Sequence, residues 1–206
     1  MKIAIASSGL GHVARGIETW ALDTAVALSQ WAVDSRPLAV EPGQSKEADI
    51  EVALFCAAPL SLPTAHCPLP TSSPSPLPTV HCPLLTIRVL PSLKRGDRLA
   101  KSLTRIFPKC AWRWGLKSTY DLEQWSFWWR LWPELRRGKF DIVHVQDPWL
   151  ALLLERSGRW GWHPAKVILA HGTEESLEFL EKFEYVQHLA PWHLEQALKN
   201  LEEKRI

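Results

Sequence analysis

The sequence has no long apolar run and little net charge. No apolar segment approaches the ~20 residues that a membrane-spanning helix needs, so none is predicted. With 24 Lys and Arg against 22 Asp and Glu, the formal net charge of the 206 residues is only +2. This balance gives the chain no general attraction to nucleic acid, and no nucleic acid is expected as a partner.

Cysteine is also scarce, with four residues at Cys56, Cys67, Cys82 and Cys110. No signal peptide is recognised ahead of them, because the chain opens directly into a short apolar strand followed by glycines. We therefore expect free thiols in a reducing, cytoplasmic environment.

The length and composition fit one globular domain spanning residues 1–206. Hydrophobic residues make up 46% of the chain and charged residues 22%, which is ordinary for such a domain. A chain of this length can bury a large core. Tryptophan and proline are unusually frequent, with 12 and 16 residues.

The opening of the chain predicts a strand, a glycine-rich turn and a helix. Lys2–Ala6 is a short apolar strand, Ser7–Gly16 is the turn, and the helix begins near Ile17. The apolar positions of that helix recur with helical periodicity. A strand that leads into a helix through glycines is typical of an α/β domain with a parallel sheet. Glycines also let the backbone approach a ligand, and a helix N-terminus offers N–H groups to an anion.

Further strands and helices alternate along the rest of the chain. Strands are predicted over residues 50–56, 85–90, 140–146, 166–170 and 184–189. Helices are predicted over residues 120–137, 150–157 and about 190–204, and Pro133 is expected to kink or end the first of them. The alternation predicts an α/β fold, a Rossmann-like parallel sheet with helices on both faces.

Residues 59–83 form a proline-rich tract with an internal repeat. Leu62–Leu69 recurs 15 residues later as Leu77–Leu84. Each copy holds an adjacent His-Cys pair, which is not the ligand spacing of zinc sites, so no metal site is predicted. Proline at this density is incompatible with a helix or a central strand, and we predict an insertion in a surface loop.

Two stretches of the sequence are candidates for peripheral membrane contact. Residues 94–117 carry eight Lys and Arg against one Asp, and four tryptophans at positions 125, 128, 129 and 132 share one face of the next helix. The favoured interpretations are a solvated basic face and a helix packed on the sheet. The alternative is peripheral contact of residues 94–132 with the acidic inner face of a membrane.

Three of the predicted strands end in polar or glycine-containing turns. These turns are Ser7–Gly9, Gln146–Pro148 and His171–Thr173. In a parallel sheet, ligands bind outside the carboxyl ends of the strands, near the switch in strand order. We therefore expect the three turns to gather at one edge of the sheet and to form the ligand site.

These turns supply the candidate site residues. His171 is predicted to be catalytic, because a histidine at a strand end before a glycine can point into a cleft and exchange a proton near neutral pH. His144 lies inside a strand and is expected to pack. Glu18 suits either helix capping or a sugar hydroxyl. The predicted substrate-binding residues are Gly9, Gly11, His12, Gly16, Glu18, Asp147, Gly172 and Thr173.

The glycine spacing disfavours a nicotinamide enzyme. Gly9 and Gly11 are followed by Gly16 rather than by a glycine at position 14, so the dinucleotide fingerprint is not matched. No acidic residue ends the second strand, where it would bind a ribose.

Three segments together resemble the family 4 (group 1) glycosyltransferases: Gly9–Glu18 within the opening unit, Phe140–Pro148 and Ala170–Thr173. The resemblance covers most of the chain apart from residues 31–49 and the repeat tract. It implies a GT-B architecture, with this chain as the N-terminal, acceptor-binding half. It also implies retaining transfer from a nucleotide sugar without a metal or other cofactor. By resemblance, the glycine turn approaches the donor diphosphate and His171 lies near the transferred sugar.

The C-terminal donor-binding domain and its paired glutamates are not recognised in the sequence. The chain is therefore expected to be incomplete as an enzyme on its own, as a truncated product or as the partner of a separate donor domain. A sugar or a lipid-linked acceptor is the expected ligand. Two alternatives stay open: a non-catalytic binding remnant, and an unrelated nucleotide- or flavin-binding α/β domain.

Overall fold

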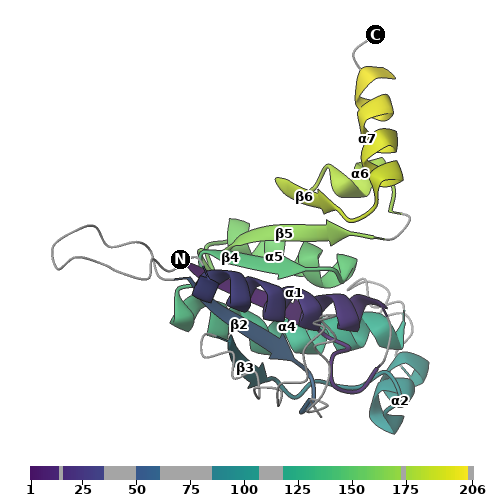
Figure 1. Ribbon diagram of the computed structural model, residues 1–206. Helices are drawn as coiled ribbons and strands as arrows, with labels where there is room; N and C mark the ends of the chain where they lie inside the picture. The colour runs from purple at the N-terminus through teal and green to yellow at the C-terminus, as the bar shows by residue number, and fades with distance from the viewer. Residues whose placement is uncertain (14–15, 35–49, 61–84, 107–117, 173–174, 204–206) are drawn as a thin grey trace, which may run out of the picture.

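The structure is a computed structural model that describes residues 1–13, 16–34, 50–60, 85–106, 118–172 and 175–203. Its centre is a six-stranded parallel sheet in the order β3-β2-β1-β4-β5-β6 (Figure 1). The strands are β1 (Lys2–Ser7), β2 (Glu51–Cys56), β3 (Leu85–Val89), β4 (Ile142–Val145), β5 (Lys166–His171) and β6 (Tyr185–His188). All six match predicted strands, and the predicted α/β, Rossmann-like fold class is confirmed.

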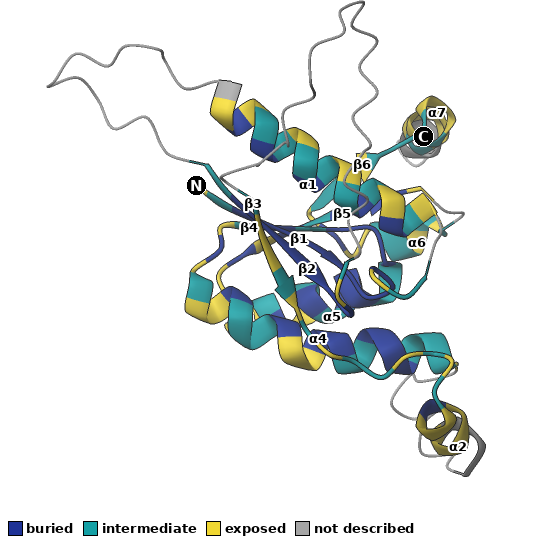
Figure 2. Cartoon of the chain, turned by 60° about the horizontal axis from the view of Figure 1, so that its bottom comes forward, coloured by how far each residue is buried: buried dark blue, intermediate teal, exposed yellow. Residues whose placement is uncertain are grey.

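Helices cover both faces of the sheet. Helix α1 (Gly16–Asp34) lies on one face, and α4 (Thr119–Gly138) and α5 (Pro148–Arg159) lie side by side on the other (Figure 2). Helix α2 (Arg98–Ile106) lies against α4. The short α6 (Leu177–Leu180) precedes β6, and α7 (Pro191–Glu203) extends away from the sheet (Figure 1).

The central strand β1 divides its side chains between the two helix layers. Ile3 and Ile5 pack in one apolar cluster with Ala21 of α1. Ala4 and Ala6 belong to the cluster on the opposite face, which α4 and α5 cover. This division follows from the two-residue period of a strand, and it leaves β1 buried on both faces.

Helix α4 continues through its internal proline. The Ser118 hydroxyl accepts a hydrogen bond from the Asp121 N–H (3.1 Å), and the Asp121 carboxylate accepts one from the Ser118 N–H (2.8 Å), which forms a capping box. Pro133 does not end the helix, contrary to one half of the prediction, and α4 runs on to Gly138. Leu131 and Leu135 on either side of the proline are fully buried, and this packing outweighs the hydrogen bond that Pro133 cannot donate.

Two predicted surface stretches are only partly described. Nearly all of the proline-rich tract, with both copies of its repeat, lies outside the described residues. In the basic stretch, α2 exposes Arg98 and Lys101 together with the apolar Leu99 and Leu103, and it buries Ala100. The solvated face and the membrane contact both stay predictions for this stretch. Among the described residues, no helix is long and apolar enough to cross a membrane.

His144 packs against a helix, as predicted for it. The ring lies in β4 and meets the ring of Trp20 from α1 edge to face, with the centroids 5.0 Å apart. Burial lowers the pKa of His144 to about 4, although a hydrogen bond with the Gln187 side chain opposes the shift. The imidazole is therefore neutral in the folded protein at neutral pH.

We predict that acidification destabilises the fold partly through this histidine. An unfolded histidine gains its proton near pH 6.5, whereas His144 in the folded chain resists protonation down to pH about 4. The free energy of unfolding should therefore fall as the pH drops through this window, by up to about 3 kcal/mol from this group. His144→Phe keeps a ring against Trp20 and should flatten this part of the profile in urea denaturation. An unchanged profile in that variant would contradict the assignment.

Candidate functional site

The three predicted turns do meet at the carboxyl edge of the sheet. Strands β1, β4 and β5 are parallel neighbours, so the segments that follow them lie along one edge. We call this edge the rim and define it as residues 8–12, 146–147 and 171–172. Helix α1 leaves β1 towards one face and α5 leaves β4 towards the other (Figure 2). The junction of β1 and β4 is therefore the switch point at which open α/β sheets bind ligands.

Asp147 joins the two sides of this switch point. Its Oδ2 accepts hydrogen bonds from the N–H (2.9 Å) and the hydroxyl (3.1 Å) of Ser8, and its Oδ1 accepts one from the Tyr120 hydroxyl of α4 (2.7 Å). The side chain is fully buried. Burial raises the pKa of Asp147 and the nearby charge of Glu18 adds to the shift, whereas the hydrogen bonds from Ser8 and Tyr120 oppose it. A substrate contact, as predicted for Asp147, would require it to release one of these partners.

Glu18 fills the space beside the glycine turn. It is buried in the first turn of α1, and a Cβ added to Gly9 would collide with its carboxylate. Glu18 therefore stands close to the helix N-terminus, where a phosphate group would otherwise be favoured. Together with Asp147 it gives the switch point two buried carboxylates, which suit hydroxyl groups better than anions.

The turn after β1 is held against the end of β2. Gly11 has a φ of 96°, and a Cβ there would collide with the carbonyl oxygen of Ala58. The Leu10 carbonyl also accepts the N–H groups of Ala57 (3.1 Å) and Ala58 (3.3 Å). Gly11 is thus required by both backbone conformation and close approach.

A buried carboxylate on α4, Glu123, fixes His12 and Arg95. Its Oε2 lies 3.1 Å from His12 Nε2, and it accepts hydrogen bonds from the Arg95 N–H (2.9 Å) and guanidinium (2.7 and 3.1 Å). Burial acts to raise the pKa of Glu123, but the hydrogen bonds from Arg95 and His12 outweigh it and the pKa is lowered. Arg95 also lies over the Tyr120 ring, 4.6 Å from its centroid. This network anchors the start of α4 at the rim.

His171 belongs to a cluster of three histidines. It ends β5 and is buried, and its Nδ1 lies 3.1 Å from Nδ1 of His188 at the end of β6. The ring of His193 from α7 lies 4.5 Å from that of His171 between centroids. Because one Nδ1 must donate and the other accept, His171 and His188 hold complementary tautomers. Burial lowers the pKa of His188, and the neighbouring His193 adds to the shift.

Most of the predicted site residues lie on the rim or directly beside it. His171 ends β5 and Gly172 follows it, and a Cβ on Gly172 would lie only 2.7 Å from Gln146 Nε2. Gly16 is exposed at the start of α1 with open space around it. Thr173 lies outside the described residues. The residues at or beside the switch point are Gly9, Gly11, His12, Glu18 and Asp147.

Sequence reasoning missed five residues that complete this arrangement. Arg95 was interpreted as part of a solvated basic stretch, and the two remaining histidines drew no attention. Tyr120 and Glu123 precede the buried Phe127 on one helix face, at the i, i+3 and i+7 positions. Polar residues on a face that packs against the core need partners, and that signal could have identified both. The missed residues are Arg95, Tyr120, Glu123, His188 and His193.

Metal binding and thiol chemistry find little support in the part of the chain that the structure describes. Among those residues, no three His, Cys, Asp or Glu side chains are arranged to hold a metal ion. Cys56 ends β2 as a buried free thiol, and burial raises its pKa to about 11. The thiol is therefore protonated at neutral pH and is a poor nucleophile.

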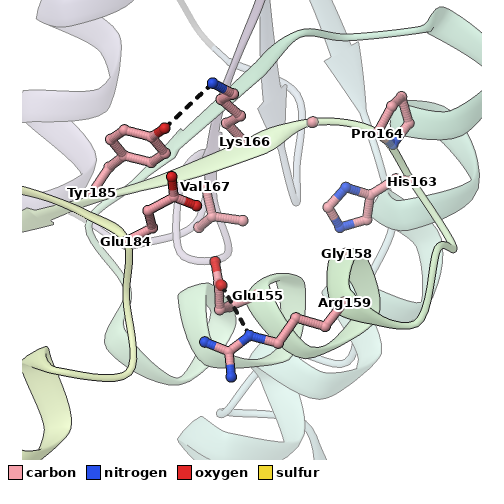
Figure 3. Close-up of a pocket in the computed structure, with 10 residues that line it drawn as sticks. Glu155, Gly158, Arg159, His163, Pro164, Lys166, Val167, Glu184 and Tyr185 are labelled. Carbon is pink, nitrogen blue, oxygen red and sulfur yellow. Dashed lines mark hydrogen bonds and ion pairs between the residues drawn. The ribbon is translucent and has the colours of Figure 1, made fainter.

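A pocket of about 230 Å³ lies away from the rim, at the opposite edge of the sheet (Figure 3). It opens between the end of α5 and the starts of β5 and β6. Arg159 pairs there with Glu155 (3.2 Å), and Lys166 donates to the Tyr185 hydroxyl (3.3 Å). The pocket shares no residue with the predicted site, and its cationic groups are engaged within its own lining.

Asp147→Ala should destabilise the fold strongly. The substitution leaves the Ser8 and Tyr120 donors buried without their acceptor, and we expect the free energy of unfolding to fall by about 3 kcal/mol in urea denaturation. Asp141→Ala is the matched control. Its carboxylate accepts the Lys2 N–H (2.7 Å) at the other end of the same strand pair, but it is exposed, so the loss should stay below about 1 kcal/mol. Equal losses in the two variants would contradict the role given to Asp147.

Gly11→Ala should also destabilise the fold, by about 2 kcal/mol or more, because of its positive φ and the collision with Ala58. Gly16→Ala adds the same methyl group where there is open space at the start of a helix, and it should be neutral or slightly stabilising. Thermal and urea unfolding would compare the two variants. If Gly11→Ala were as stable as the wild type, the positive φ and the close approach to Ala58 at this turn would be contradicted.

Comparison of the chain with protein-family models, with curated proteins and with solved structures finds no match. No relative therefore provides a family or a function, and the resemblance to glycosyltransferases stays a prediction. The parallel sheet and the arrangement of the rim are seen in the structure and do not depend on any relative.

Proposed function

We propose that the chain is the acceptor-binding, N-terminal domain of a retaining glycosyltransferase that uses a nucleotide sugar. The observation that carries the proposal is the meeting of the β1 glycine turn, Asp147 and His171 along one rim that includes the switch point. The three segments that resemble the family 4 (group 1) enzymes are the segments that the fold brings together. The resemblance therefore gains support from their shared position.

The charges of the rim favour a polyhydroxylated acceptor, such as a sugar or a lipid-linked sugar. Glu18 and Asp147 place two buried carboxylates at the switch point. Glu18 borders the glycine turn and is the one suited to accept hydrogen bonds from sugar hydroxyls, because Asp147 is already engaged by Ser8 and Tyr120. The same carboxylates would repel a diphosphate, so we expect a second, donor-binding domain to hold most of the donor. The contact with His188 orients the His171 ring, and in this proposal the ring lies next to the transferred sugar. The proposal assigns no role to a metal or cofactor.

The strand order gives a specific reason to keep one alternative, an unrelated nucleotide- or flavin-binding domain. The order β3-β2-β1-β4-β5-β6 is that of dinucleotide-binding sheets. Against it, β2 ends at Cys56 and is followed by Ala57 and Ala58, so the carboxylate that would bind a ribose is missing there, and Glu18 stands near the phosphate position. The absorbance spectrum of the purified protein separates the alternatives, because a co-purified flavin would favour the second.

We predict that neutral sugars bind to the chain in preference to free nucleotide. Saturation-transfer NMR with glucose, galactose, mannose and N-acetylglucosamine would be compared with the same measurement on UDP. Glu18→Gln should weaken the binding of a sugar about tenfold, because a charged hydrogen-bond acceptor is lost while its size is kept. Glu178→Gln on the exposed surface of α6 is the control and should leave binding unchanged.

Three results would overturn the proposal. Binding of UDP without binding of any sugar would favour the nucleotide-binding alternative. Rapid sugar transfer from nucleotide sugars by this chain alone would contradict its assignment as an acceptor-side half. Sugar binding with no transfer, even after a donor domain is supplied, would favour the non-catalytic alternative.

A further inference from the structure

Six tryptophans form one connected surface over α4 and the end of α5. Ring contacts run from Trp125 to Trp129 (6.1 Å between centroids), from Trp129 to Trp132 (6.4 Å) and from Trp132 to Trp162 (5.1 Å). Trp128 and Trp160 each join through Trp162, at 5.8 and 5.4 Å. We call these six residues the tryptophan surface.

The tryptophan surface has a buried inner side and an exposed outer side. Trp128 is buried, and its indole N–H donates to the Ser157 hydroxyl on α5 (3.2 Å). Trp129 and Trp160 are 52% and 65% exposed. In Figure 2, α4 turns its buried positions towards the sheet and its exposed positions away from it. The inner contacts thus hold large aromatic rings rigidly at the protein surface, which lowers the entropy lost when they bind.

The exposed charges that continue this surface are positive. Arg136 follows Trp132 by one helical turn, and Arg156 precedes Trp160 by one turn, and both are exposed. The carboxylates on the same two helix ends are engaged by other arginines: Glu134 by Arg88 and Arg137 (2.9 Å each), and Glu155 by Arg159 (3.2 Å). The exposed rings are therefore bordered by guanidinium groups.

We propose that the tryptophan surface docks the chain on an anionic lipid bilayer. Indole rings favour the boundary between headgroups and acyl chains, since one edge of the ring is apolar and the other carries an N–H. Guanidinium groups beside them match the lipid phosphates in charge and geometry. A sugar-binding platform would instead need exposed hydrogen-bond acceptors beside the rings, whereas the exposed side chains one turn from Trp132 and Trp160 are the donors Arg136 and Arg156. The proposal does not depend on the proposed transferase function.

The test is co-sedimentation of the full chain with vesicles of phosphatidylcholine containing about 30% phosphatidylglycerol, compared with vesicles of phosphatidylcholine alone. We expect binding to the anionic vesicles, weakened by salt. The double variant Trp129→Ser/Trp160→Ser should lower the partition coefficient by about tenfold or more. The control is Trp31→Ser/Trp192→Ser, which removes rings that are 56% and 65% exposed on α1 and α7, and it should bind like the wild type.

A second pair of variants tests the charges. Arg136→Glu/Arg156→Glu should reduce binding to anionic vesicles several-fold, whereas Lys166→Glu/Lys199→Glu makes the same change in net charge on β5 and α7 and should have little effect. Circular dichroism would verify that each variant is folded.

Three results would overturn the proposal. One is the absence of binding to anionic vesicles. Another is that Leu99→Ser/Leu103→Ser in α2 loses vesicle binding while Trp129→Ser/Trp160→Ser binds like the wild type. That result would assign the membrane contact to α2. The third is self-association in sedimentation velocity that the Trp129→Ser/Trp160→Ser variant abolishes, which would make the surface an interface between copies of the chain.

Discussion

One buried carboxylate determines how the middle of the rim is built. Asp147 receives hydrogen bonds from the turn after β1 and from the start of α4, so it connects three segments that are remote in the sequence. Burying the Asp147 carboxylate without its hydrogen-bond donors would cost free energy, so the three segments are expected to pack cooperatively. The positions of the glycine turn, of Glu18 beside it and of the first turn of α4 all follow from this requirement.

Helix α4 carries both of the surfaces for which we propose a role. Its first turns supply Tyr120 and Glu123 to the rim, and its middle supplies the tryptophan surface. Because Pro133 does not end the helix, the two surfaces lie on one continuous element. A chain held at a membrane through the tryptophans would therefore keep its rim at a fixed distance and orientation from the lipid. That geometry would suit an acceptor presented at the membrane surface.

The sequence predicted the sheet well because each strand is an apolar run of strand length, bounded by polar or proline-containing residues. It also predicted the rim, since parallel strands place their carboxyl ends at one edge. It failed where a residue's partner comes from a distant segment. Arg95 was assigned to solvent because its partner Glu123 lies on α4, 28 residues further along the chain. The sequence also could not decide whether Pro133 would kink α4 or end it, because burial of Leu131 and Leu135 is a tertiary effect that local propensity does not contain.

The two aspartates that flank β4 have a consequence for the order of assembly. Asp141 accepts a hydrogen bond from the Lys2 N–H, and Asp147 accepts one from the Ser8 N–H, each across 139 residues of chain. These two hydrogen bonds fix the register of β1 on β4 at both ends of the strand pair. Strand β1 is one of the two central strands, and during synthesis it is made long before its neighbour β4. Contacts of such sequence separation slow folding. Until β4 arrives, one side of β1 is an open edge, exposed to pairing with other nascent chains.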